Sequence, residues 1–191
     1  MSNQPTKEHI LISTIDAIEK HGLDNLTTRL IAEEAGVNNA ALHYYYGTKD
    51  NLVEEALNHT ANHMLCDTKD ILTTEESIET RLRELLAYII EGVENFPNII
   101  RAHLMGPIYY ANRRDTLTQL LGSWIELAEN AIRESGAGRS PQQIKFSLNM
   151  IFSYIIMYGL FKTQESEDAW MDLREPVTRE RFLRQAVEML I

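Results

Sequence analysis

The sequence predicts an all-α protein of about nine helices, and three observations carry that prediction. Apolar residues recur at steps of three and four along nearly the whole chain of 191 residues, which is the period of a helix with one buried face. Alternation of the strand type is almost absent. The five prolines and nine glycines are few enough to leave long helical stretches. Since 44% of the residues are hydrophobic and 24% are charged, the composition suits one or two compact units.

Four helices are expected in the first 66 residues. The first has an apolar face at positions 11, 15 and 18 and stops at Gly22. The second ends at residues 35–36, the third carries residues 40–46, and the fourth runs to about Cys66. The residues expected to open the last three of these helices are Thr27 or Thr28, Asn38 or Asn39, and Thr48.

The later helices are expected from capping signals and from proline. A segment opens at Pro97, and residues 106–107, Gly-Pro, are expected to break or kink it. Further helices are expected over about 116–135 and after Thr178. Two S/T-x-x-E/Q capping boxes are expected, Thr73 with Glu76 before the helix at 82–89, and Ser140 with Gln143 before the helix that ends at residue 161.

Charge and cysteine content limit the function classes. The chain has 18 Lys and Arg against 28 Asp and Glu, a net charge of −10, which by itself argues against a general nucleic-acid binder. The single cysteine excludes an intrachain disulfide framework and favours a cytoplasmic setting. No basic start precedes a secretory apolar stretch, and residues 148–161 are too short to span a bilayer, so no membrane partner is expected.

The first fifty residues contain a helix-turn-helix pattern, because the second and third short helices meet at a tight turn at Gly36. Residues 27–37, TTRLIAEEAGV, and residues 42–52, LHYYYGTKDNL, carry a closer resemblance. They are similar to the N-terminal domain of the TetR family of transcriptional repressors, whose pattern is Thr, Ile-Ala, Ala-Gly-Val, Leu-Tyr-x-x-Phe, Lys and a closing Leu. The resemblance covers about residues 10–57. It implies a DNA-binding domain over 1–50 and a ligand-responsive regulator that binds double-stranded operator DNA.

Physical reasons accompany the expected DNA contacts. Thr28 sits where the family binds a phosphate, although a plain N-cap needs the same residue type. Arg29 suits the acceptors of guanine and equally suits a phosphate. His43 replaces a family tyrosine that bonds phosphate, and Tyr46 replaces a core phenylalanine. The full set of expected DNA-binding residues is Thr27, Thr28, Arg29, Asn38, Asn39, Ala40, Ala41, His43, Tyr44, Tyr45 and Lys49.

The acidic charge is unevenly placed. Residues 1–50 hold four Lys or Arg and seven acids, a net charge of −3, so residues 51–191 hold fourteen and twenty-one, a net charge of −7. Residues 36–49 contain no acid. The expected contact surface is therefore neutral to slightly positive, and we expect weak nonspecific DNA affinity with a shallow salt dependence.

The resemblance implies that residues 51–191 form a helical domain that binds a small-molecule effector and dimerises through its last two helices. The helix over residues 144–161 is apolar around most of its circumference, as expected for a helix that serves both a core and a partner chain. The expected effector-site residues are Tyr88, His103, Met105, Tyr109, Trp124, Phe152, Tyr154, Met157 and Tyr158. The expected dimer residues are Phe146, Met150, Phe161, Phe182, Leu183, Ala186 and Leu190.

Other functions find little support in the sequence. His59, His63 and Cys66 share one helical face and are candidates for a metal site, and the competing interpretation is a solvated or pocket-edge face. No metal or other cofactor is expected. Motifs of hydrolases, P-loop proteins and zinc proteases are absent, so no catalytic residues are expected. The alternatives to a regulator are a helical adaptor and a small helical enzyme that uses the C-terminal aromatic residues.

Overall fold

The described part of the chain is helical throughout. The structure is a computed structural model that describes residues 7–109, 116–137, 139–161 and 172–191; for residues 105–109, 116, 117 and 161 it describes the backbone only. Nine α-helices and one short 3-10 helix account for the secondary structure of these residues, and none of them forms a strand. The all-α prediction is confirmed. None of the helices in the described ranges is long and apolar enough to cross a membrane.

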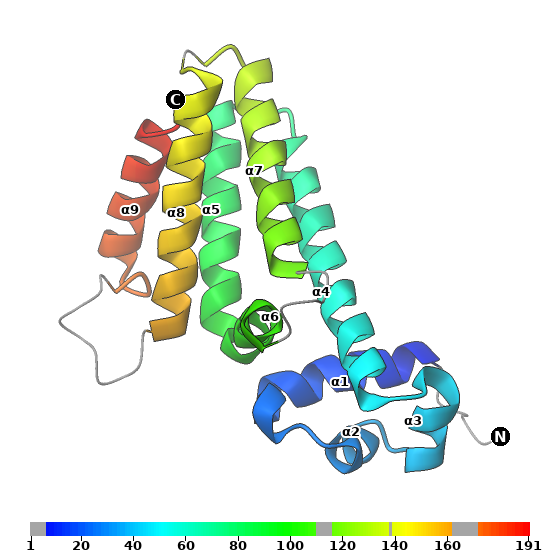
Figure 1. Cartoon of the computed structure of the whole chain (residues 1–191). Helices are drawn as coiled ribbons and strands as arrows, with labels where there is room; N and C mark the ends of the chain where they lie inside the picture. The colour runs from blue at the N-terminus through cyan, green and yellow to red at the C-terminus, as the bar shows by residue number, and fades with distance from the viewer. Residues whose placement is uncertain (1–6, 110–115, 138, 162–171) are drawn as a thin grey trace. The chain divides into compact units, whose positions relative to one another are not determined.

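Figure 1 labels the nine α-helices of the described residues in chain order. Their bounds are α1 Lys7–His21, η1 Leu23–Asn25, α2 Thr28–Glu34, α3 Asn39–Tyr46, α4 Lys49–Leu72, α5 Ile78–Asn95, α6 Pro97–Tyr109, α7 Thr116–Glu134, α8 Pro141–Phe161 and α9 Pro176–Glu188.

Local capping signals gave several helix starts correctly. Thr27 caps α2, since its Oγ1 accepts a hydrogen bond of 3.2 Å from Leu30 N. Before α8, Ser140 and Gln143 form the reciprocal capping box, with Ser140 N donating to Gln143 Oε1 at 3.1 Å and Gln143 N donating to Ser140 Oγ at 3.3 Å. Pro97 is the first residue of α6, as expected.

Four boundaries differ from the predictions. The box of Thr73 with Glu76 was wrong, because Ser77 Oγ caps α5 by accepting from Thr80 N. The hydroxyl of Thr73 instead donates to Lys69 O at 2.9 Å, so α4 continues six residues past Cys66 to Leu72.

Residues 106–107 do not break α6, which runs on to Tyr109. The last helix starts at Pro176 rather than after Thr178, since the Glu175 carboxylate caps it.

The chain divides into two compact units. The first comprises Met1–His63 and Asn98–Leu117, and the second comprises Met64–Pro97 and Thr118–Ile191. The core of the first unit joins α1–α3 and the start of α4 to two residues of α6, Ile99 and Ala102. The helix-turn-helix therefore shares its core with a segment that lies more than forty residues further along the chain.

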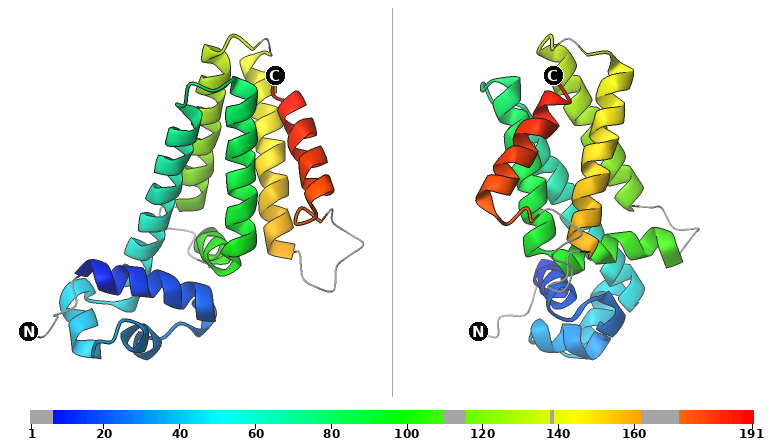
Figure 2. Two further views of the ribbon diagram at one scale, coloured as in Figure 1. Left: turned by 180° about the vertical axis from the view of Figure 1, so that it is seen from behind. Right: turned by 90° about the vertical axis from the view of Figure 1, so that its left-hand side faces the viewer.

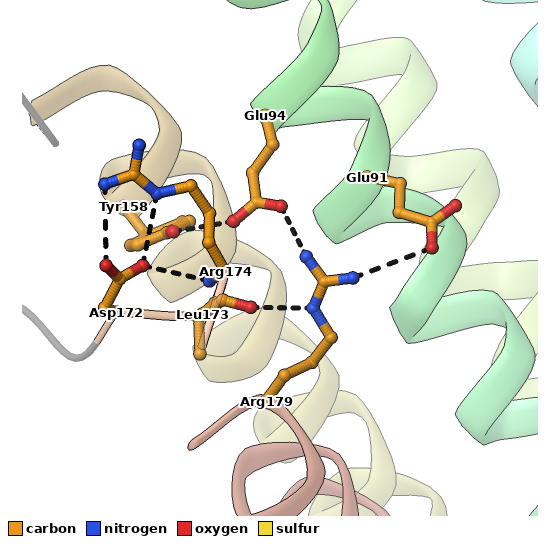
Figure 3. A network of polar contacts seen from close by, with 7 residues as sticks. All are labelled: Glu91, Glu94, Tyr158, Asp172, Leu173, Arg174 and Arg179. Atoms are coloured by element: carbon orange, nitrogen blue, oxygen red, sulfur yellow. Dashed lines mark hydrogen bonds and ion pairs between the residues drawn. The ribbon is translucent and has the colours of Figure 1, made fainter. Parts of the chain in front are cut away.

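In the second unit, α5 packs against both α8 and α9 (Figure 2). The approach of α5 and α8 is close at Gly159, where an added Cβ would lie 2.7 Å from Val93 Cβ. On the α9 side, Arg179 ties the helix start to α5 (Figure 3). Its guanidinium pairs with the Glu94 carboxylate and donates from Nε to Leu173 O at 2.7 Å. Burial and the Glu94 carboxylate, which accepts from the Tyr158 hydroxyl, raise the pKa of Tyr158.

Candidate nucleic-acid interface

Only one side of helix α3 packs against the core of the first unit. Asn38 caps it, with its Oδ1 accepting a 3.0 Å hydrogen bond from Ala41 N. It ends at Gly47, whose φ of 74° lies in the region that glycine adopts without strain. Leu42 and Tyr46 are its buried residues, and both belong to the core of the first unit. The other side of α3 remains available to a partner.

Tyr46 fixes α3 against α1. Its hydroxyl donates to Lys7 O at 2.6 Å, and burial raises its pKa to about 12. The Lys7 ammonium lies over the same ring, 4.9 Å from the ring centroid. Tyr46 is thus a core residue, as the pattern of the sequence predicts.

The exposed side of α3 carries the predicted base-reading and phosphate-binding residues. Tyr44 is 82% exposed, and its ring lies edge-on against that of Tyr45, with 4.9 Å between the ring centroids. Residues 36–49 contain no carboxylate, and most of them are exposed. An approaching phosphate backbone therefore meets no acidic side chain from α3. Asn38, Asn39, Ala40, His43 and Tyr44 are exposed, and Ala41 and Tyr45 are half-buried.

The proton position of His43 follows from one contact. Its Nδ1 lies 2.7 Å from Gly47 O, and a carbonyl oxygen only accepts, so the ring donates from Nδ1. In the neutral ring the exposed Nε2 is then an acceptor. His43 donates to a phosphate from Nε2 only when the ring carries both protons, which distinguishes it from the tyrosine of the family pattern.

The fold brings Lys49 to the start of α2. Its Nζ donates to Leu26 O at 2.9 Å, although 23 positions separate the two residues. Thr27 and Thr28 follow Leu26 directly, at a helix N-terminus that favours an anion. The Lys49 ammonium therefore lies close to the start of α2, and its contact with phosphate stays a prediction. Arg29, in the first turn of α2, is exposed and pairs with Glu33 at 3.1 Å, an exposed ion pair that costs little to exchange for another anion.

The predicted effector-site residues fall in different places. Trp124 and Phe152 are buried together, edge to face, with 5.8 Å between their ring centroids. The hydroxyl of Tyr88 donates to Asp67 at 2.7 Å. Tyr154 stacks on Phe182 of α9, and Met157 is 41% exposed. Tyr158 belongs to the Arg179 network, His103 is buried on α6, and the side chains of Met105 and Tyr109 lie outside the described residues. Their role at an effector site stays a prediction.

The predicted dimer residues separate into two groups. Phe146 and Met150 on α8 are 66% and 44% exposed. Phe182 is half-buried, and the side chain of Phe161 lies outside the described residues. Leu183 and Ala186 of α9 are instead buried within the chain's own core, and Leu190, which follows the helix, is buried as well.

His59, His63 and Cys66 do not converge on a metal site. Within the ranges that the structure describes, no group of three His, Cys, Asp or Glu side chains is placed to hold a metal ion. Although all three residues lie on α4, His63 and Cys66 are exposed and His59 is half-buried, which matches the solvated face considered as the alternative.

Two contacts of the first unit had no signal in the sequence. Glu19 of α1 accepts two hydrogen bonds from the start of α6, one at its carboxylate from Ile99 N at 3.0 Å and one at its backbone oxygen from Asn98 Nδ2 at 2.8 Å. Burial raises the pKa of Glu19. On α4, Thr60 meets His103 of α6 at 3.0 Å. Since 80, 79 and 43 positions separate the three bonded pairs, local patterns could not reveal them.

Comparison with known proteins agrees with this geometry. Residues 10–56 match the family described as bacterial regulatory proteins, tetR family. The chain is 24% identical over 100 residues to the HTH-type transcriptional regulator BetI of Vibrio vulnificus, covering 51% of this chain and 50% of that protein. It is 24% identical over 160 residues to the HTH-type transcriptional regulator YvkB of Bacillus subtilis, covering 80% and 82%. The chain spans about half or less of the length of the first curated relatives that it matches.

A solved structure extends the likeness to the whole fold. The transcriptional regulator FadR of Bacillus subtilis, solved in complex with stearoyl-CoA, superposes with a TM-score of 0.67 over 97% of this chain and 98% of that chain, at 12% sequence identity. The helix-turn-helix of α2 and α3, its exposed polar side, the match over residues 10–56 and the shared helical fold lead to one family. Over residues 10–56 the chain is similar to the tetR family of bacterial regulatory proteins, and its helical fold is similar to that of solved TetR-type regulators.

Proposed function

We propose that the protein is a DNA-binding transcriptional regulator, a homodimeric repressor that a small-molecule effector releases from a palindromic operator. The observation that carries the DNA-binding part is the acid-free, exposed side of α3 beside a core-bound opposite side. Lys49 at the start of α2 adds a phosphate-binding place next to it. A regulator of this kind binds and releases DNA without covalent chemistry, so no residue is assigned a catalytic role.

An apolar stripe on α8 supports the homodimer. Phe146, Met150 and Met157 are exposed and follow one another at steps of four and seven, so they share one side of the helix. Val177, at the start of α9, is also exposed. A second copy of the chain, related by a twofold axis, would present the same stripe. The two stripes would then cover each other and remove both apolar surfaces from water. The two α3 helices would then reach successive major grooves of a palindrome.

The composition of the first unit supports release by an effector. The α6 residues Ile99 and Ala102 lie in the core that also holds α2 and α3, and Glu19 joins α1 to the start of α6. A ligand that moves α6 therefore acts on the unit that contacts DNA. Release requires that the effector bind the DNA-incompetent arrangement more tightly, and the shift is limited by that difference in affinity. FadR, which shares the fold, was solved in complex with stearoyl-CoA, and this lends support to a ligand here.

Operator binding tests the proposal directly. We expect salt-dependent binding to a palindromic DNA fragment taken from near the protein's own gene. Arg29→Ala and Lys49→Ala should each weaken that binding about 5- to 100-fold, since one charge-assisted phosphate or base contact contributes about 1–3 kcal/mol. Arg133→Ala and Lys69→Ala serve as matched controls, because both side chains are exposed outside the first unit.

The same four variants require a dimer measurement by sedimentation or light scattering. We expect all of them to stay dimeric, so that lost DNA affinity reports the contact surface. Unchanged operator affinity in both Arg29→Ala and Lys49→Ala would refute the site assignment. A monomeric wild-type protein at micromolar concentration would refute the homodimer.

A further inference from the structure

The buried side chain of His103 in α6 contains a nitrogen atom that has no hydrogen-bond partner among the described residues. Its side chain is 3% exposed. Its Nε2 lies 3.0 Å from Thr60 Oγ1, whereas its Nδ1 has no hydrogen-bond partner among the described residues. An unpaired buried nitrogen lowers the stability of a fold, so such an atom calls for a ligand, an ion or a water molecule.

The hydrogen bonds around Thr60 decide which proton the ring carries. Thr60 Oγ1 donates to Leu57 O at 2.9 Å, because a carbonyl oxygen only accepts. The hydroxyl has one proton, so toward His103 its oxygen is the acceptor and the ring donates from Nε2. The ring is neutral, since burial lowers the pKa of His103 to about 4. The unpartnered Nδ1 therefore presents a lone pair inside the protein.

We propose that Nδ1 of His103 is the hydrogen-bond acceptor of the effector site, and that the effector is an uncharged molecule carrying an O–H or N–H donor. This inference rests on the proposed function, because it names the chemistry that the regulatory ligand presents. A carboxylate or phosphate would place a second lone pair against the first. A metal ion needs further ligands, and the described residues offer no group of three that could hold one.

The position of His103 links this contact to DNA binding. Ala102, its neighbour on α6, lies in the core shared with α2 and α3, and Thr60 lies on α4, the helix that follows α3. A ligand bonded to Nδ1 would hold α6 through His103 and α4 through Thr60. The acceptor is thus placed within the same unit as the DNA-contacting helices.

The proton position is testable without any ligand. In the full-length protein labelled with 15N-histidine, two-bond proton–nitrogen spectra distinguish the two neutral tautomers, and comparison with His103→Gln assigns the His103 signals. We expect the Nε2–H tautomer near neutral pH. In Thr60→Val the acceptor for Nε2–H is lost, and we expect the Nδ1–H form to gain population. An Nδ1–H tautomer in the wild type would overturn the proposal.

Phenol and anisole then test the ligand class, because they are similar in size and differ in the O–H donor. We expect phenol to shift the Nδ1 resonance of His103 and to bind about tenfold more tightly than anisole, and benzoate to cause no shift. His103→Leu should remove the preference for phenol, and His59→Leu, on α4, should keep it. Should His103→Leu fail to fold, Thr60→Val provides the second test, since loss of the preference is expected there too and its retention would contradict the proposal.

The failure of this inference is separable from the failure of the proposed function. The acceptor site is refuted if phenol leaves the Nδ1 resonance of His103 unchanged, or if phenol and anisole bind with equal affinity. A water molecule would then be the hydrogen-bond partner of Nδ1. Operator binding of the ligand-free protein is measured alongside. Intact operator binding in that case leaves the regulator in place, while absent operator binding refutes the regulator itself.

Discussion

The buried neutral His103 should make the protein sensitive to mild acid. Burial lowers its pKa to about 4 in the folded state, whereas an unfolded histidine titrates near about 6.5. Below the pKa of the unfolded chain, the unfolded histidine binds a proton, whereas the folded one stays neutral. The free energy of unfolding therefore decreases as the pH falls. The two pKa values give a loss of about 1.3 kcal/mol between about pH 7.5 and about pH 5.5, which grows to about 3 kcal/mol near pH 4.

The perturbation is His103→Gln, which removes the titration while keeping an amide N–H that can donate to Thr60. The assay is urea unfolding followed by circular dichroism at about pH 7.5 and about pH 5.5, the two upper values, at one fixed chain concentration. The upper values are chosen because the sequence pI is about 5.1. We expect the variant to lose about 1.3 kcal/mol less than the wild type over this interval.

The control is His59→Gln on α4, which makes the same substitution at a half-buried histidine. Equal pH dependence in the wild type and in His103→Gln would refute the reasoning, because it would mean that His103 titrates alike in the folded and unfolded chains.

Two further predictions concern the second unit. Gly159→Ala should destabilise the protein by about 1–3 kcal/mol in chemical unfolding, because the new Cβ would lie 2.7 Å from Val93 Cβ. Gly122→Ala in α7 meets no atom within 4 Å and should instead be neutral or stabilise by up to about 1 kcal/mol; destabilisation of both would contradict the steric argument. Met150→Lys should convert the dimer to monomer at micromolar concentration, measured by sedimentation, and an unchanged dimer would remove the α8 stripe from the interface.

Predictions from sequence succeeded where the determining interactions are local. The cap at Asn38 and the box of Ser140 with Gln143 each involve residues three apart, so the residue types alone fix the contact. The box of Thr73 with Glu76 failed although its pattern is as good, because Ser77 is an equally suitable cap four residues later. The Thr73 hydroxyl bonds back to Lys69, which lengthens α4 instead. A local signal indicates a boundary but does not choose between two competing caps.

The break or kink expected at residues 106–107 illustrates another limit, because the helix is not broken there. Proline removes one backbone donor and favours a helix end, and this preference is a matter of a few kcal/mol. The helix α6 nevertheless continues to Tyr109, and its earlier residues Ile99 and Ala102 are held in the core of the first unit. Tertiary packing of this kind outweighs a local preference.

The sequence by itself determined the helical class and the helix-turn-helix with its exposed polar side, because both follow from periodicity, caps and one glycine turn within about fifty residues. Only the tertiary structure decided which distant residues meet. It set Lys49 beside Leu26, Ile99 in the core of α2 and α3, and Thr60 against His103. It also turned Leu183 and Ala186 inward while leaving Phe146 exposed. These outcomes depend on how whole helices pack, and a helix presents several sides among which spacing alone does not choose.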